Sequence, residues 1–444
     1  PAGRLDAPGR QLDAHRVPVR FGDRLHRLTR NFRATTAEAR VALAHGPLLQ
    51  QVTDKGEAGR LYEELRDLLL DPANGMGALD DEFTLEGLRD VSDTCAILTR
   101  DNQQALVVSG LLHAHGIDHR LRRPLEERPV PYWVAELLRR TEATGLTEDR
   151  FRTLLSEIPQ PYEPDGTALW PVLRRVARGA GRGVLDLDRL RRAVADGRFP
   201  DEAADPENAR IVVSTVHRAK GLEFDRVIVL TPPPVAELHK RHQDELDLPA
   251  EARALYVAMT RARQDLYHVA PPELPHFKRA GGRRHGRRYL GSWRSYDRYG
   301  IVADSGDVCR NDPPGHQGDA VATQAYLLEH VQPGQEVLLR KRHDLPMSEV
   351  ESPPYALMHD GKEIGEASQR FREDLFQVQK VNRTWDPWWP DEIHDLRIDT
   401  LETVTGSTAA GTNAGLGERG VWIAPRITGI GRYRRADDYE EQRA

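Results

Sequence analysis

The sequence predicts an α/β protein: a parallel sheet with a small helical insertion, followed by a smaller β-rich region. Three observations predict this arrangement. Residues 211–230 hold two short β-branched apolar runs around a polar segment, residues 94–116 read as a strand followed by a helix, and short strand candidates dominate after residue 320. Short apolar runs are typical of buried strands, and strands that alternate with helices favour parallel pairing.

Length and composition limit the classes of protein that fit. The 444 residues suffice for two or three domains of roughly 100–200 residues each. Hydrophobic content is 39%, charged content is 30%, and no apolar run reaches the ~20 residues of a membrane span. The net charge of −6 neither supports nor excludes nucleic-acid binding. Cys95 and Cys309 have no metal-site spacing and suit a reducing cytoplasm, so we expect no metal site and a cytoplasmic location.

The chain begins at Pro1 without an initiator Met and shows no N-terminal apolar segment, so we expect either a trimmed polypeptide or an incomplete reading of a longer gene. Residues 1–24 read as a connector or the remnant of a preceding domain. From Leu25 a short extended run leads into a helix, with Thr36 as its N-cap. A further helix is expected over residues 62–70.

The strand-to-helix unit has clear boundary signals. Residues 94–99 form the expected strand, and Asp101 is placed to cap the helix that follows. Gln104 stands three residues later, as in a capping box, and Gly116 provides a stop.

The middle of the chain reads as helical. Residues 124–208 form an Arg- and Pro-punctuated insertion, with helices expected over 133–140 and 185–195. After the second apolar run, the prolines at 232–234 end the strand, since proline cannot donate to a sheet ladder. A helix is then expected over 251–263. Its apolar face repeats at i, i+3, i+4 and i+7, at Leu255, Ala258, Met259 and Ala262.

The last part changes character. Residues 276–319 are basic and Gly-interrupted, and we interpret them as a linker. Residues 320–444 form the expected β-rich domain, with a hairpin turned by Asp360-Gly361. Further strands are expected over 336–340, 396–404 and 421–430.

Four segments resemble motifs of UvrD/Rep-like superfamily 1 DNA helicases, in the order in which that family carries them. Motif V, T-x-H-x-x-K-G-L-E-F, is matched at Thr215, His217, Lys220, Gly221, Leu222, Glu223 and Phe224. Motif VI, E-x-R-x-x-Y-V-x-x-T-R-A, is matched at Glu251, Arg253, Tyr256, Val257, Thr260, Arg261 and Ala262. Motif IV, L-x-x-N-Y-R-S, is matched at Leu28, Asn31, Phe32 and Arg33, with Phe in place of Tyr. The A-I-L-x-R-x-N-A-Q segment is matched at Ala96, Ile97, Leu98, Arg100, Asn102 and either Gln103 or Gln104.

The resemblance implies that residues 25–123 and 209–275 form the second RecA-like domain of such a helicase, called 2A. Residues 124–208 occupy the position of the mobile 2B subdomain. This insertion looks reduced, so the duplex contacts of 2B are not carried over.

The resemblance also implies a nucleotide site. Arg33 and Arg261 match the catalytic arginines that reach the γ-phosphate of ATP, a task that suits a permanently charged, planar guanidinium. Phe32 would stack on adenine, Glu223 would accept a hydrogen bond from the ribose, and Gly221 would form a tight turn beside the nucleotide. The alternatives are surface arginines, a core phenylalanine, an exposed acid and a purely structural turn.

Four further residues match positions that hold single-stranded DNA: Arg100, Asn102, Thr215 and His217. Contacts of this kind go to phosphate and sugar, so they are independent of sequence and sensitive to salt. Helix or turn capping remains the alternative for Thr215 and Asn102. The basic aromatic stretch 283–298 is interpreted as a charged linker, and the alternative is a nucleic-acid contact through charge and stacking. Asp399 with Glu402 lacks the Asp/Glu-x-Lys of a nuclease, which disfavours that chemistry.

No G-x-x-x-x-G-K-[ST] loop occurs among the 444 residues. ATP and Mg²⁺ would therefore be held mainly by a first RecA-like domain, and we expect no ATP hydrolysis by this chain alone. The expected function is the C-terminal part of an ATP-dependent 3′-5′ DNA helicase. The expected partners are single-stranded DNA or a duplex/single-strand junction and the N-terminal helicase half, in cis or in trans, but no membrane. The alternative is a motor-derived, non-catalytic adaptor that binds DNA or protein.

Overall fold

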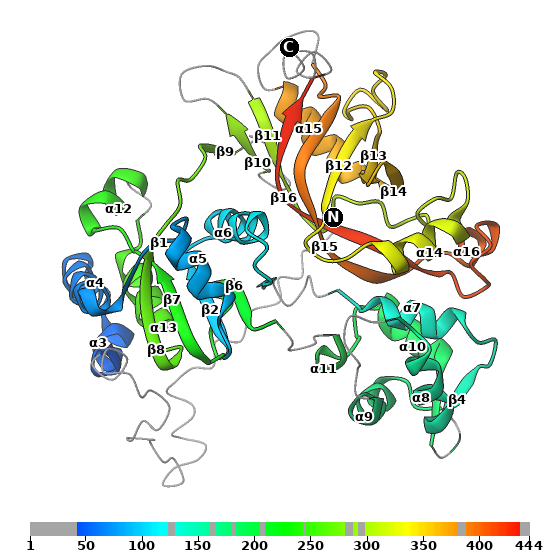
Figure 1. Cartoon of the computed structure of the whole chain (residues 1–444), viewed down its shortest axis with the longest axis horizontal. Helices are drawn as coiled ribbons and strands as arrows, with labels where there is room; N and C mark the ends of the chain where they lie inside the picture. Colours follow the sequence, from blue (N-terminus) through cyan, green and yellow to red (C-terminus); the bar gives the residue numbers. More distant parts are fainter. Residues whose placement is uncertain are drawn as a thin grey trace, which may run out of the picture.

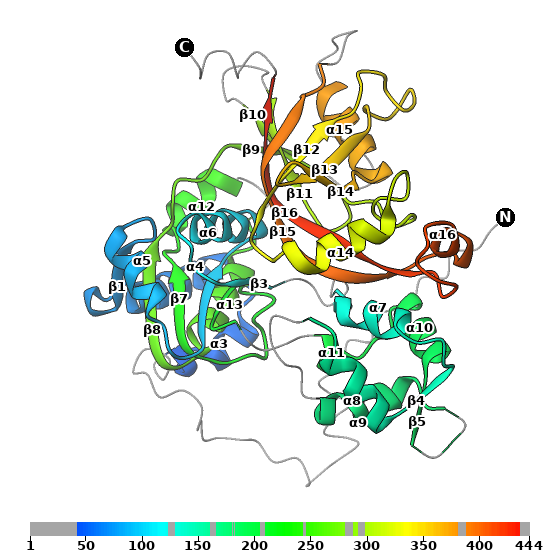
Figure 2. The same cartoon turned by 45° about the vertical axis from the view of Figure 1, so that its right-hand side comes forward.

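The protein is described here by a computed structural model. The described residues are 42–122, 129–159, 166–179, 181, 183–204, 209–242, 246–279, 287–291, 298–380 and 388–435. Figures 1 and 2 show three regions: a parallel sheet with its helices, drawn blue to green, a helical insertion in teal to green, and a large antiparallel sheet in yellow-green to red. Motif IV, with Phe32 and Arg33, lies outside the described residues, as do the expected helix start at Leu25 and its cap at Thr36.

The first region is a six-stranded parallel sheet in the order β1-β8-β7-β2-β6-β3. All five pairings are parallel, and β2 lies between β7 and β6. Both apolar runs of residues 211–230 are strands, as predicted. The strands are β1 (Gly75–Ala78), β2 (Cys95–Thr99), β3 (Arg120–Leu121), β6 (Ile211–Thr215), β7 (Phe224–Leu230) and β8 (Ala262–Ala270).

Helices cover both faces of this sheet. In β2 the side chains alternate between two cores: Ala96 and Leu98 belong to one, and Cys95 and Ile97 to the other. The first core is built with α4 (Lys55–Leu69) and α13 (Leu248–Met259), and the second with α5 (Glu82–Arg89) and α6 (Asn102–Ala114). A sheet buried on both faces explains why its strands read as continuous apolar runs. The same layer also holds the 3₁₀ turn η2 (Pro72–Asn74) and the short helices α3 (Gly46–Gln51) and α12 (Val235–His242).

The expected capping of α6 is present. The Asp101 carboxylate accepts hydrogen bonds from the backbone N–H groups of Gln103 and Gln104, at 2.8 and 2.9 Å. The Gln104 side chain accepts a bond from the backbone N–H of Arg100 at 2.8 Å, so the reciprocal bond reaches one residue before the cap. Gly116 follows the helix with φ +64°, the left-handed conformation that ends helices.

The helix expected over residues 251–263 has different ends. α13 begins at Leu248 and stops at Met259, where the Thr260 hydroxyl donates hydrogen bonds to the carbonyls of Tyr256 and Val257. Ala262 is buried as the first residue of β8 and not on the helix face. The apolar repeat at this position therefore comes from strand burial, which periodicity alone does not distinguish from helix burial.

In the described parts of residues 129–204, the insertion comprises five helices and a two-stranded antiparallel pair, β4 with β5. Its elements are α7 (Tyr132–Arg139), β4 (Gly145–Thr147), α8 (Glu148–Ser156), α9 (Gly166–Val176), β5 (Val184–Asp186), α10 (Leu187–Ala195) and α11 (Asp201–Ala204).

The third region is an eight-stranded antiparallel sheet in the order β14-β13-β12-β15-β16-β11-β10-β9. The expected hairpin is present, with Asp360 and Gly361 both at positive φ, 45° and 78°. The strands are β9 (Phe277–Arg279), β10 (Arg288–Gly291), β11 (Arg298–Ala303), β12 (Glu336–Lys341), β13 (Tyr355–His359), β14 (Lys362–Glu366), β15 (Glu392–Thr405) and β16 (Val421–Arg434). The helices are α14 (Ala320–His330), α15 (Gln369–Lys380) and α16 (Thr408–Asn413).

The interpretation of residues 276–319 as a linker is wrong, because β9, β10 and β11 belong to this sheet. The sequence did not indicate these strands, because basic residues are usually exposed. Arg287, directly before β10, is only 7% exposed, and Asp307 and Asp374 bind its guanidinium. A buried arginine held by carboxylates is compatible with a strand in a core.

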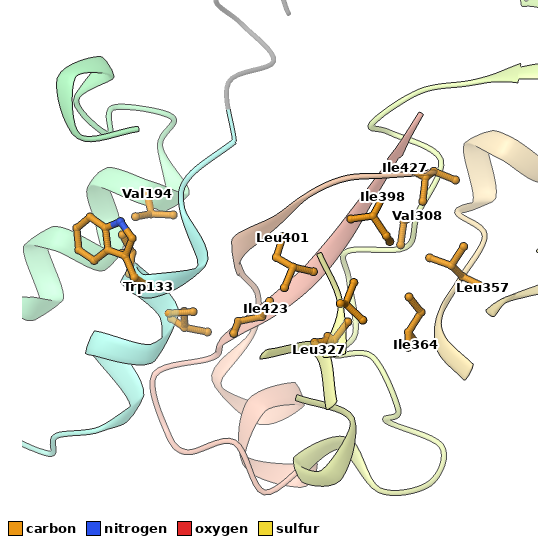
Figure 3. Packing of buried hydrophobic residues seen from close by; sticks show 14 of the residues in the cluster. Trp133, Val194, Val308, Leu327, Leu357, Ile364, Ile398, Leu401, Ile423 and Ile427 are labelled. Carbon is orange, nitrogen blue, oxygen red and sulfur yellow. The ribbon is translucent and has the colours of Figure 1, made fainter. Parts of the chain in front are cut away.

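The insertion packs against the antiparallel sheet. Figure 3 shows Trp133 and Val194 of the insertion beside Leu401 and Ile423 of β15 and β16, in one continuous apolar cluster. The Thr403 hydroxyl ties the two together: it donates a bond to the Pro131 carbonyl at 2.6 Å and accepts one from the backbone N–H of Ala135 at 3.0 Å. An insertion between β3 and β6 of one sheet is thus built into the core of another. No helix among the described residues has the length and apolar character needed to cross a membrane.

Candidate functional site

Polar segments gather at both ends of the parallel sheet. At its carboxyl end, Thr99 of β2 and Thr215 of β6 are direct Cα partners, so the segments that follow these strands emerge side by side. At its amino end, Phe224 of β7 and Ala262 of β8 are partners, so the segments that precede them meet. The candidate residues divide between these two ends.

The first group is the carboxyl-end cluster, which we define as Arg100, His217 and Glu251. Arg100 donates two hydrogen bonds to the Glu251 carboxylate, from Nε at 2.6 Å and from Nη2 at 2.5 Å. Its Nη1 lies 3.2 Å from His217 Nε2. The strand end of β2, the turn after β6 and the first turn of α13 each supply one member, so three separate matched motifs converge.

Glu251 orients Arg100 without using up its donors. The hydrogen bonds to Glu251 raise the pKa of Arg100, while partial burial acts in the opposite direction. Of the five N–H groups in a guanidinium, these three contacts within the described structure use three. Because the Arg100 side chain is 41% exposed, the remaining donors are accessible to an anionic group in solvent.

Asn102 and Thr215 lie at the same end but differ in exposure. Asn102 is exposed in the first turn of α6. Thr215 is only 4% exposed, and its carbonyl accepts hydrogen bonds from the backbone N–H groups of Arg218 and Ala219. Thr215 therefore turns the chain after β6, which fits the structural alternative better than a direct contact through its side chain.

The second group is the amino-end cluster, which we define as Gly221, Glu223, Arg261 and Arg263 with the Leu222 carbonyl. Arg261 donates hydrogen bonds to the carbonyls of Val257 and Leu222 and to the Thr260 hydroxyl, each at 3.1 Å. Its own carbonyl accepts a bond from the backbone N–H of Phe224 at 3.0 Å. Arg261 thus joins the turn before β7 to the turn before β8, and the acceptors of these three hydrogen bonds are uncharged oxygens.

Gly221 and Glu223 occupy the turn that faces Arg261. Gly221 has φ +87°, which an L-residue rarely adopts, although a Cβ there would meet open space. Glu223 is partly buried, and Arg263 Nε lies 3.3 Å from its carboxylate. The glycine is needed for the backbone turn, as the sequence indicated, and a carboxylate at this place can accept a hydroxyl hydrogen bond.

The helix α13 connects the two clusters. Glu251 is in its first turn and Arg261 lies two residues beyond its end. Ten residues of helical rise separate them by roughly 15 Å. A single packed helix therefore joins the two clusters.

Asp399 and Glu402, weighed above as nuclease residues, are engaged in ion pairs. Arg426 Nη1 donates to the Glu402 carboxylate at 2.8 Å, and Arg426 Nε lies 3.6 Å from Asp399. The described residues contain no group of three or more His, Cys, Asp or Glu arranged to hold a metal ion.

No site role was expected from the sequence for two residues of the clusters, although one of them, Glu251, belongs to motif VI. Glu251 and Arg263 both stand in or beside motif VI, and each binds a residue that was singled out, Arg100 and Glu223 respectively. The sequence does contain opposite charges in separate motifs. Only the fold shows which of these charges form pairs.

A fully parallel sheet covered by helices on both faces, with the candidate residues at its strand ends, defines the class: a RecA-like α/β domain. Residues 199–270 match the family described as UvrD-like helicase C-terminal domain. Over 67 residues the chain is 45% identical to the putative ATP-dependent DNA helicase YjcD of Bacillus subtilis (strain 168), a match that covers 14% of this chain and 9% of that protein. Within the RecA-like region, residues 199–270 are thus similar to the C-terminal domain of UvrD-like helicases, and the chain spans only a small part of the length of this relative.

Proposed function

We propose that this chain supplies the C-terminal half of an ATP-dependent 3′-5′ DNA translocase or helicase of the UvrD/Rep type. The observation that carries the proposal is the division of the matched residues between two ends of one sheet, with α13 joining the ends. One end presents donors for a DNA backbone, and the other presents an oriented arginine and a carboxylate for a nucleotide.

The amino-end cluster has a donor set that fits a nucleotide. A guanidinium held by neutral oxygens is oriented in advance for phosphate oxygens, as Arg261 is. Glu223 can accept a hydrogen bond from a ribose hydroxyl. ATP, when bound, supplies the phosphoanhydride whose cleavage drives the cycle, and Arg261 stabilises the negative charge that develops. In this proposal Arg33 contributes a second positive charge and Phe32 an aromatic face.

The carboxyl-end cluster suits a single strand. Arg100, Asn102 and His217 are exposed at one edge and offer N–H donors, while Thr215 shapes the turn beside them. Contacts of this kind go to phosphate and sugar, so binding should be independent of sequence and should weaken with salt.

A second candidate is a non-catalytic adaptor that binds DNA or protein. It is favoured by one observation: the 444 residues contain no G-x-x-x-x-G-K-[ST] loop. The two candidates predict different behaviour when a first RecA-like domain is supplied. The translocase half gains DNA-stimulated ATP turnover, whereas the adaptor does not.

The test compares Arg261→Ala with His217→Ala in a motor reconstituted from this chain and a first RecA-like domain that carries the phosphate-binding loop. Arg261→Ala should lower kcat for ATP by about 10³-fold, because it removes a transition-state contact, and should leave single-strand affinity within about twofold of the wild type, since phosphate contacts carry that affinity. His217→Ala should mainly weaken DNA binding. Arg60→Ala, which removes an exposed arginine of α4 that pairs with Glu64, is the control.

The isolated 444-residue polypeptide should not hydrolyse ATP, since an arginine finger stabilises a transition state that other residues assemble. DNA-stimulated turnover by the isolated chain would contradict the proposal. So would wild-type turnover by the reconstituted Arg261→Ala motor.

A further inference from the structure

A cleft of about 500 Å³ opens where the insertion meets the antiparallel sheet, far along the chain from both clusters. Its volume lies within the roughly 300–1,000 Å³ typical of ligand sites. Val130, Val194 and Gly197 line the insertion side. The opposite side is formed by the 305–311 segment, α15, β15 and β16, through Ser305, Gly306, Arg310, Asn311, Arg370, Glu402, Thr403, Val404, Thr405 and Arg426.

Three guanidinium groups reach the cleft from three different elements. Arg310 comes from the segment after β11, Arg370 from α15 and Arg426 from β16. Arg310 and Arg370 are each 40% exposed at the side chain, whereas Arg426 is 3% exposed. Gly306 lets Arg370 approach, because a Cβ at that position would collide with Arg370 Nη1.

These arginines share their carboxylates. Glu402 binds both Arg310, at 2.5 Å, and Arg426, at 2.8 Å. Asp304 binds Arg370 at 2.7 Å and is also 3.5 Å from Arg287, which is already held by Asp307. Among the residues that line the cleft, three guanidiniums therefore face one carboxylate.

Donor capacity remains on the exposed pair. Arg370 donates to Asp304 from Nη2, and its side chain is 40% exposed. Arg310 directs Nη2 to Glu402 and to the Ser305 carbonyl. Burial lowers the pKa of Arg310 and the nearby Arg426 charge adds to that effect, while Glu402 opposes it. An anion placed between these groups would relieve the repulsion.

We propose that this cleft binds a phosphate group of a nucleic-acid strand, as a second contact beyond the RecA-like domain. The inference rests on the proposed function, which supplies the strand. A strand fits better than free phosphate because the cleft is larger than one phosphate. Beside the arginines it offers polar Asn311, Thr403 and Thr405 for neighbouring oxygens and apolar Val130 and Val194 for a sugar face. None of these groups is placed to read a base edge.

The experiment measures binding of a fluorescent single-stranded oligonucleotide to the full chain as a function of salt. The double variant Arg310→Gln/Arg370→Gln should bind about tenfold more weakly, and its slope of log K against log salt should be shallower by about 0.7, the value for the loss of one phosphate contact. The Arg310→Lys/Arg370→Lys variant keeps both charges and should retain the wild-type slope. Recovery of the slope by lysine separates charge from folding.

The matched control is Arg152→Gln/Arg175→Gln, which removes two exposed arginines of the insertion, each paired with one glutamate. It should bind like the wild type.

Wild-type affinity and slope in the double glutamine variant would overturn the inference. Loss of binding in His217→Ala alone would then leave the proposed function intact. Displacement of the strand by low concentrations of inorganic phosphate at constant ionic strength would assign the cleft to free phosphate and also overturn it. An absence of strand binding by the wild type would contradict both proposals.

Discussion

The pair of Arg100 and Glu251 decides how the carboxyl-end cluster behaves. The two hydrogen bonds are charge-assisted and bidentate, a geometry that fixes a guanidinium in one orientation. Because the Arg100 side chain is 41% exposed, solvent screens the pair, and its value lies in orientation more than in stability. Glu251 also places a negative charge beside residues that we propose to meet phosphate.

Glu251→Gln should therefore strengthen single-strand binding. The substitution removes that charge and releases Arg100 to neutralise a phosphate, so the salt slope should become steeper by about 0.7. Fluorescence anisotropy over a salt series measures this. Glu64→Gln, which breaks an arginine pair on α4, is the control. An unchanged slope would mean that Glu251 does not compete with DNA for Arg100.

His113 is a second residue whose surroundings have a measurable effect. It lies on α6 with its ring 4.2 Å from that of His119, and its ring packs against Gly334 of the β-rich region. Burial lowers the pKa of His113 to about 3, with contributions from His119 and Arg397. Burial also lowers the pKa of His119.

This depression makes stability depend on pH. In the unfolded chain the pKa of His113 is its ordinary 6.5, so between about pH 6.5 and pH 3 the unfolded state binds more protons than the folded one. The stability that neutral, buried His113 contributes to the folded state is fully present above pH 6.5 and is lost as the pH falls toward 3. We expect a loss on the order of 1 kcal/mol at pH 5 after allowing for partial exposure.

The measurement is urea unfolding of wild type and His113→Gln between pH 7 and pH 5. The difference in unfolding free energy between the two should shrink as the pH falls, whereas His115→Gln, an exposed histidine on the same turn, should track the wild type. Parallel pH profiles for all three proteins would contradict the assignment.

Among the structural elements, the hairpin of β13 and β14 is set by its turn. Asp360 and Gly361 both have positive φ, as a two-residue turn of this hand requires. A Cβ at Gly361 would meet nothing within 4 Å, and the same holds at Gly87 in helix α5, whose φ is not positive. These two exposed glycines differ in backbone conformation and not in available space.

Alanine should therefore act with opposite sign at the two positions. Gly361→Ala should destabilise the protein by about 1 kcal/mol through left-handed strain, and Gly87→Ala should stabilise it by roughly 0.5–1 kcal/mol by raising helix propensity. Denaturant midpoints of the two variants and the wild type provide the comparison. A shift in the same direction for both would show that φ does not control the effect.

The elements that were predicted correctly from the sequence are determined by residues that lie close together in the chain. The caps of α6 and the turn at Asp360-Gly361 depend on residues within a few positions of one another. The errors have non-local causes. Ala262 is buried by pairing with β7, and β10 is stabilised by carboxylates of Asp307 and Asp374 that are distant along the chain. Neither cause is visible in a window of ten residues.

The same division applies to the candidate site. Motif spacing indicated Arg100, Glu223 and Arg261, and the fold assigned them to opposite ends of the sheet. The partners Glu251 and Arg263 lie 151 and 40 residues away from the residues that they bind. Local periodicity contains no information on such pairs.

In the whole molecule, the order of the segments along the chain does not match the way in which their apolar side chains group into hydrophobic cores. The insertion interrupts the RecA-like domain in sequence, yet its apolar side chains share one cluster with the antiparallel sheet. The two faces of the parallel sheet have separate clusters. Arg419 reinforces the shared unit by donating hydrogen bonds to the carbonyls of Leu138 and Ala143, both at 2.6 Å, near the end of α7.

Separate cores predict separate unfolding. We expect two calorimetric transitions, one for the RecA-like domain and one for the insertion together with the antiparallel sheet, because cooperativity follows shared burial and not chain order. Trp133 is 2% exposed within the shared cluster. Trp133→Ala should cost about 3–5 kcal/mol and lower the second transition alone. Leu61→Ala, in the RecA-like core, should cost about 2–5 kcal/mol and lower only the first. If the insertion were instead an appendage of the RecA-like domain, Trp133→Ala would lower the same transition as Leu61→Ala, and the assignment of the insertion to the β-rich unit would be wrong.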